Sequence, residues 1–108
     1  MKYLSRPEEM ILLAVSRLKQ DAYGVSIRKL VQKWTGKYWS IGAIYVPLER
    51  LERKGFVTST TSAPTPERGG RKKRIFKITR SGVQELEKIR QVNSAMWEGY
   101  PETAGEKD

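Results

Sequence analysis

Two short runs of β-branched and aromatic residues, 56–61 and 74–78, flank a loop that contains two prolines and two glycines. Such runs are typical of β-strands, and the loop between them is too irregular for a helix or a strand. The three segments before this hairpin, 5–18, 23–34 and 40–54, repeat apolar residues at steps of three and four, as amphipathic helices do. Three helices followed by one small hairpin predict a mainly helical domain, and 108 residues suffice for one such core.

Local signals mark the ends of the first two helices. Ser5 and Glu8 have the spacing of a capping box, and Pro7 fits the first turn, where its missing N–H is no loss. The second helix is expected to stop before Gly36, because glycine adopts the left-handed conformation at little cost. The buried stripes predicted for these helices are Met10, Ile11, Ala14, Val15 and Leu18, and then Tyr23, Ile27, Leu30, Val31 and Trp34.

The third helix is predicted to begin after Ser40, a favourable N-cap, and to end in a Schellman turn at residues 54–56. Pro47 removes one hydrogen bond inside this helix and predicts a bend near Ala43. At about 100° per residue, the face opposite the buried stripe is centred on Val46. The stripe itself is expected to comprise Ile41, Ile44, Leu48 and Leu51.

A fourth and longer helix is predicted to follow Thr79, a further N-cap. The polar residues 101–108 are expected to form a disordered tail. The predicted division of the chain is therefore 1–78, 79–100 and 101–108. The seam of the last helix follows steps of four and three, as in a coiled coil, and comprises Gly82, Leu86, Ile89, Asn93, Met96 and Tyr100.

The chain contains 21 basic and 12 acidic residues, a net charge of +9, and neither histidine nor cysteine. The missing types are the usual general base and the commonest metal ligands, so we expect no enzymatic activity, no metal and no cofactor. The positive charge favours nucleic acid or an anionic membrane as the partner, but no predicted helix pairs a broad apolar face with a basic one. No apolar run is long enough for a signal sequence or a membrane span, so a cytoplasmic location is expected.

Three helices and a hairpin with a basic tip form the order of a winged helix-turn-helix, whose third helix enters the major groove of DNA. Small residues at the start of this helix would let its backbone approach the bases, and arginines at its end would reach guanine or phosphate. A plain surface helix with tolerated small residues is the alternative interpretation. The residues predicted to read DNA are Ser40, Gly42, Ala43, Val46, Arg50 and Arg53.

The hairpin loop favours DNA binding over that alternative. Five of the seven residues 68–74 are cations, which can follow phosphates along an adjacent minor groove, and the glycines let the tip turn tightly. The wing residues predicted to contact DNA are Arg68, Gly69, Gly70, Arg71, Lys72 and Lys73.

Six short motifs lie in order along the chain: residues 7–13 (PEEMILL), 23–24 (YG), 42–45 (GAIY), 48–55 (LERLERKG), 66–71 (PERGGR) and 78–82 (ITxxG). At matching positions, from about residue 4 to 86, they resemble the PadR family of bacterial transcriptional regulators. The resemblance implies a dimeric repressor with a winged helix-turn-helix and a C-terminal dimerisation helix. By the same analogy Tyr45 contacts a DNA phosphate; its alternative role is to pack, half-buried, on the second helix.

The chain is similar to the short subfamily, since only one helix is predicted after the wing. Its dimer interface is then expected to comprise Leu86, Ile89, Asn93, Met96 and Trp97. Asn93 either pairs with its symmetry mate or faces water. In some short members a tryptophan on the last helix sandwiches planar ligands, so Trp97 and Met96 are candidates for an effector site; the alternative is plain dimer core.

We therefore expect a sequence-specific DNA-binding regulator, a repressor that acts as a homodimer on an inverted-repeat operator. A winged-helix module that docks onto an acidic protein without reading DNA is the main alternative. An RNA-binding winged helix is a second one.

Overall fold

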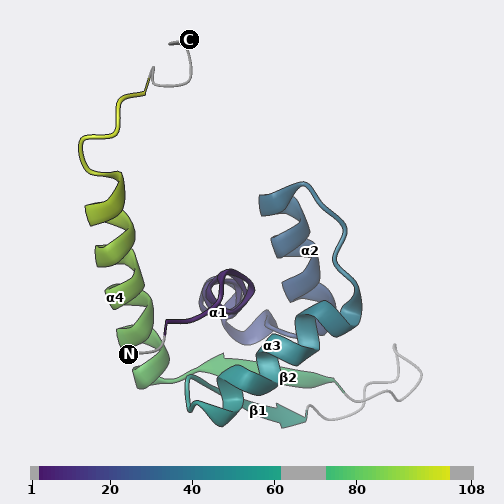
Figure 1. The fold of residues 1–108 in the computed structure, drawn as a ribbon. Helices are drawn as coiled ribbons and strands as arrows, with labels where there is room; N and C mark the ends of the chain where they lie inside the picture. Colours follow the sequence, from purple (N-terminus) through teal and green to yellow (C-terminus); the bar gives the residue numbers. More distant parts are fainter. Residues whose placement is uncertain (1–2, 62–72, 103–108) are drawn as a thin grey trace.

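The computed structural model describes residues 3–61 and 73–102. Along the chain it contains the helices α1 (Arg6–Leu18), the short 3-10 helix η1 (Lys19–Asp21), α2 (Gly24–Thr35) and α3 (Ile41–Arg53), then the strands β1 (Val57–Thr61) and β2 (Arg74–Ile78), and finally α4 (Arg80–Trp97). This order, shown in Figure 1, confirms the mainly helical fold with one hairpin and a C-terminal helix.

Side-chain caps begin three of the helices where the sequence predicts them. The Ser5 hydroxyl accepts from the Glu8 N–H at 3.2 Å, and the Ser5 N–H donates to the Glu8 carboxylate at 2.7 Å, which completes the capping box. The Ser40 hydroxyl accepts from the Ala43 N–H, and the Thr79 hydroxyl accepts from the Gly82 N–H, both at 3.1 Å. Each cap satisfies an N–H that the helix itself leaves unpaired.

A Schellman turn ends α3, also as predicted. Gly55 has a φ of +80°, and its N–H donates to the Glu52 carbonyl at 3.0 Å. The Phe56 N–H donates to the Leu51 carbonyl at 2.9 Å. These two bonds turn the chain directly from the third helix into β1, so the helix and the hairpin keep a fixed relative orientation.

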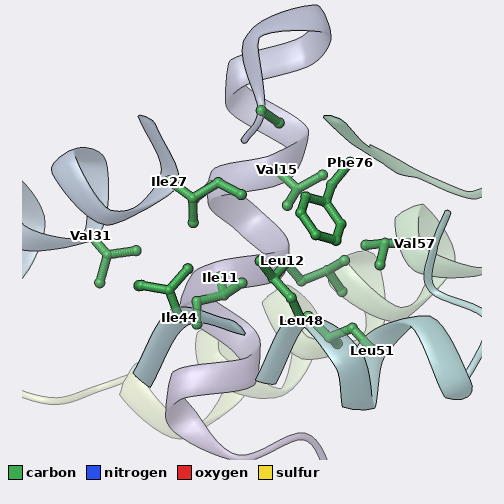
Figure 2. Close-up of a cluster of buried hydrophobic side chains, with 12 residues drawn as sticks. Ile11, Leu12, Val15, Ile27, Val31, Ile44, Leu48, Leu51, Val57 and Phe76 are labelled. Carbon is green, nitrogen blue, oxygen red and sulfur yellow. The ribbon is translucent and has the colours of Figure 1, made fainter. Parts of the chain in front are cut away.

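Side chains from α1, α2, α3 and both strands converge on one core, as Figure 2 shows. Fully buried residues include Ile11 and Leu12 of α1, of which Leu12 was not expected. Those from the remaining elements are Ile27, Val31, Ile44, Leu48, Leu51, Val57 and Phe76.

Two residues expected in the buried stripes are exposed instead. Ile41 is 43% exposed because it is the first residue of α3, with no turn of its own helix before it to cover its side chain. Trp34 is 40% exposed in the last turn of α2. Pro47 is buried, and α3 runs through it as one helix to Arg53, so the proline does not divide the helix.

The hairpin carries an extra contact from the connection between α1 and α2. β1 and β2 are antiparallel, with Val57 opposite Ile78 and Ser59 opposite Phe76. On the other edge of β2, the Phe76 N–H donates to the Ala22 carbonyl at 2.8 Å, and Tyr23 forms a bridge with Ile75. β1 begins at Val57 and not at Phe56, because Phe56 belongs to the turn that ends α3.

α4 leaves the end of β2 and extends on the side of the molecule opposite α2 (Figure 1). The start of α4 lies close to the hairpin, at the buried Gly82. A Cβ added to Gly82 would overlap the Phe56 carbonyl and lie 2.7 Å from Ile78 Cγ1, so only glycine fits there. Leu86 packs against the core, whereas Met96 and Trp97 are 66% and 64% exposed. Within residues 3–61 and 73–102, no helix has the length and apolar character needed to cross a membrane.

Candidate nucleic-acid interface

The exposed face of α3 is rotated slightly from the predicted one. Its buried side comprises Ile44, Pro47, Leu48 and Leu51. The predicted buried side contained Ile41 in place of Pro47. At about 100° per residue, the opposite face is then centred between Gly42 and Arg53, with Val46 beside them. All the predicted DNA-reading residues remain exposed: Ser40, Gly42, Ala43, Val46, Arg50 and Arg53.

The beginning of this face is open to close approach. A Cβ built on Gly42 would meet no atom within 4 Å, so the backbone there is bare of neighbouring side chains. Val46 presents its apolar side chain with 50% of its surface exposed. A base edge or a thymine methyl group could therefore contact the helix directly at these positions.

Tyr45 is half-buried between α3 and α2. A Cβ on Gly24, the first residue of α2, would lie 2.5 Å from the Tyr45 hydroxyl oxygen, so the ring occupies the space that Gly24 leaves. Its ring centroid is 6.2 Å from that of Phe76. The ring thus packs on the second helix, and its hydroxyl lies at the first turn of α2, where the N–H groups of that helix begin.

Arg74, the last cation of the basic run, is engaged inside the domain. Its Nη2 lies 2.6 Å from the Glu52 carboxylate, and its Nε donates to the Ser59 hydroxyl at 3.2 Å. The Ser59 hydroxyl donates to the other oxygen of Glu52 at 2.8 Å. Because Glu52 belongs to α3, Ser59 to β1 and Arg74 to β2, this cluster joins the candidate recognition helix to the base of the hairpin.

Lys73 is the one predicted wing residue that lies in the described part of the chain. Its ammonium is 3.8 Å from the centroid of the Tyr23 ring, a cation–π contact that joins the base of the wing to the start of α2. The other predicted wing residues, Arg68, Gly69, Gly70, Arg71 and Lys72, lie outside the described residues.

A further cationic surface was not singled out from the sequence, although a signal for it exists. Between Asp21 and Glu49 the chain contains no acidic residue, but it contains four cations: Arg28, Lys29, Lys33 and Lys37. This stretch includes α2, the connection to α3 and the first half of α3. From residue 22 to residue 48, the helix-turn-helix therefore carries only positive side-chain charges, in addition to those of the wing.

The predicted dimer residues divide into two groups along α4. Leu86 contacts the core of its own chain, and the Asn93 amide donates to the Glu9 carboxylate of α1 at 3.1 Å. Trp97 packs edge-on against Tyr100, with ring centroids 5.2 Å apart. A groove of about 830 Å³ runs between the N-terminal segment and α4, lined by residues that include Tyr3, Leu4, Ile89, Val92, Asn93 and Met96.

The carboxyl group of Glu8 has a shifted pKa, and it lies away from this interface. Burial alone would raise the pKa of Glu8, but hydrogen bonds from the Ser5 backbone and the Lys54 ammonium lower it below the ordinary value of 4.5. In the described part of the chain, no group of three or more acidic side chains is placed to hold a metal ion.

Comparison with known proteins identifies the family and supports the fold described above. The family model described as the transcriptional regulator PadR-like family matches residues 11–88. No curated protein gives a significant match. Among solved structures, a PadR-like transcriptional regulator of Bacillus cereus is 27% identical, with 82% of this chain and 81% of that chain covered and a TM-score of 0.66.

Two other solved structures show the same fold at lower identity. A PadR family transcription regulator of Clostridium difficile is 22% identical, with coverages of 85% and 90% and a TM-score of 0.68. A PadR-like transcription factor of Bacteroides fragilis is also 22% identical, with coverages of 84% and 82% and a TM-score of 0.69. Since the family model spans most of the chain, including all of α2, α3 and both strands, this protein belongs to the PadR-like family of transcriptional regulators.

Proposed function

We propose that this chain is a repressor that binds an inverted-repeat DNA operator as a homodimer. The observation that carries the proposal is the exposed face of α3, which has small residues at its beginning and arginines at its end. This face adjoins a hairpin whose loop sequence is strongly basic. A helix of this kind fits the major groove, while a basic wing can hold the flanking phosphates.

The two surfaces would have different tasks. On α3, Gly42 and Ala43 allow close approach, Val46 meets a thymine methyl group, and Arg50 or Arg53 reaches guanine. The wing cations of residues 68–73 and the Tyr45 hydroxyl would contact phosphates, which carry no sequence information. The proposed DNA-binding domain comprises residues 1–78.

Dimerisation is proposed to occur along residues 79–100. Beyond Leu86, α4 contacts α1 through Asn93 and Glu9, but Val92 and Met96 remain exposed. Together with Ile89 they line a groove that a second copy of α4 can fill. A two-fold axis there would set two recognition helices about 34–36 Å apart, one turn of DNA. An occupied operator would then exclude polymerase from the promoter.

Binding to duplex DNA from upstream of the chain's own gene, compared with a scrambled duplex over a salt series, tests the proposal. A preference of about 10³-fold or more for the native duplex is expected of a specific regulator. Replacing Arg50 or Arg53 by alanine should change the sequence preference, whereas neutralising Arg71, Lys72 and Lys73 together should weaken binding to both duplexes and flatten the salt dependence. Equal and steeply salt-sensitive binding of the wild type to both duplexes would contradict a nearby operator.

A further inference from the structure

Arg28 is a half-buried cation in the second turn of α2. Its Nε atom is shielded from solvent and has no hydrogen-bond acceptor in the described part of the chain. The ion pairs within that part join Arg6 to Glu9, Lys54 to Glu8 and Arg74 to Glu52, so none includes Arg28. Buried donors are nearly always satisfied, by protein groups, by water or by an ion, so this guanidinium has hydrogen-bonding capacity that the described part of the chain does not use.

The residues one turn before and one turn after Arg28 show which way its face of α2 is turned. Gly24 lies against the Tyr45 ring of α3. The Gln32 side-chain oxygen accepts from the Trp39 N–H at 3.0 Å, in the connection that leads into α3. Residues four apart share a helix face, so Arg28 lies on the side of α2 that contacts Tyr45 and the connection into α3.

The sequence around Arg28 supplies no carboxylate. Asp21 and Glu49 are the nearest acidic residues on either side, and the segment between them has a charge of +4 from its four cations. An anion bound there would reduce the repulsion among these cations as well as satisfy the Arg28 guanidinium.

We infer that Arg28 binds a phosphate of the DNA backbone at the edge of the groove that α3 enters. The inference rests on the proposed function and adds a phosphate contact outside both α3 and the wing. A guanidinium presents parallel N–H donors that match two phosphate oxygens, and it stays charged at any relevant pH. The phosphate would meet the part of this half-buried side chain that stays open to solvent, and Tyr45 and the first turn of α2 lie on the same face.

The test compares Arg28→Met with Arg17→Met, which removes the same charge from an exposed position on α1. Affinity is measured against the upstream duplex and a scrambled duplex over a salt series. Arg28→Met should weaken binding to both duplexes about tenfold and reduce the slope of log K against log salt by about one, whereas Arg17→Met should leave the slope unchanged. An unchanged slope for Arg28→Met would overturn the inference.

Thermal unfolding separates this role from a structural one. Because no ion pair of Arg28 is found within residues 3–61 and 73–102, Arg28→Met should melt within a few degrees of the wild type. A large drop in Tm would mean that the guanidinium stabilises the fold itself, and would also overturn the inference. Arg28→Lys retains the side-chain length and the charge but not the paired donors, so it should bind several-fold more weakly with a nearly unchanged slope.

The outcome for Arg28 is independent of the outcome for the operator. The operator proposal depends on the sequence preference of the wild type. The Arg28 contact depends on the change in slope on the scrambled duplex, which is observable even if the wild type shows no preference at all.

Discussion

The Lys54 ammonium lies 2.9 Å from a carboxylate oxygen of Glu8, and this pair joins the end of α3 to the first turn of α1. The Glu8 side chain is only 5% exposed, and its other oxygen accepts the Ser5 N–H. One carboxylate therefore caps the first helix and also holds the C-terminal end of the candidate recognition helix.

The Glu8→Gln variant should be less stable than the wild type at pH 7 by roughly 1–2 kcal/mol, since charge-assisted hydrogen bonds are lost. The folded state lowers the Glu8 pKa below 4.5, so the carboxylate stabilises the fold at pH values above 4.5 and loses this effect as the pH falls through the lower folded value. Denaturant unfolding of both proteins between pH 7 and pH 3 measures the difference, which should shrink on acidification. A difference that stays constant over this range would contradict the proposed origin.

Replacing Gly82 by alanine should destabilise the chain by about 1–3 kcal/mol, the usual range for overpacking. The new Cβ would overlap the Phe56 carbonyl and crowd Ile78, so α4 would have to move away from the hairpin. Thermal unfolding measures the loss. A variant as stable as the wild type would mean that the start of α4 is not held closely against the Phe56 turn.

Gly42→Ala should have the opposite effect on stability. The position is an exposed helical residue with no atom near the added Cβ, so alanine should raise stability by up to about 1 kcal/mol. If the α3 backbone approaches the bases there, the same methyl group should weaken DNA binding. A more stable variant with undiminished affinity would show that DNA does not come close to Gly42.

Neutralising Glu52 distinguishes two interpretations of its charge. An acid that merely lies near DNA repels phosphates, so its removal would raise affinity. Because Glu52 instead holds Arg74 and Ser59 at the base of the hairpin, Glu52→Gln should lower affinity for DNA several-fold. The affinity of Glu52→Gln for the upstream duplex, measured at fixed salt, distinguishes the two interpretations. Tighter binding than the wild type would mean that the cluster does not position the wing.

Val92→Glu should convert the proposed dimer to a monomer and so weaken operator binding at least tenfold. Val92 is exposed in the single chain and lines the groove beside α4, so the charge should not disturb the fold of the monomer. Ser94→Glu adds the same charge on the opposite face of α4 and serves as the control. Sedimentation gives the oligomeric state of each variant. If Val92→Glu remained dimeric, the dimer interface would not include this part of α4.

Local signals in the sequence predicted most of the fold. The caps at Ser5, Ser40 and Thr79 and the turn at Gly55 depend on residues within a few positions, so spacing and residue type were enough. The predictions of buried residues were wrong at two helix ends. There the neighbouring elements, and not the helical period, decide exposure, as Ile41 and Trp34 show.

The candidate site was harder to predict, because its contacts join residues far apart in the chain. The predicted wing contacts include Lys73, which lies over the Tyr23 ring, and the next cation, Arg74, pairs with Glu52. Similarly, Asn93 had two expected partners, a symmetry mate or water, and its amide donates to Glu9 of the same chain. Nothing in local spacing indicates such pairings.

The contacts of β2 with its two neighbours have a consequence for how such a regulator can diverge. One edge of the strand is bonded to β1 and the other to the connection before α2, so a one-residue slip would move Phe76 out of the core. The position of the hairpin base is thus set independently of the residues that join its strands. If α3 and the hairpin loop bind DNA as proposed, insertions, deletions or charge changes within residues 62–72 would change affinity for the DNA backbone while the proposed recognition helix keeps its position.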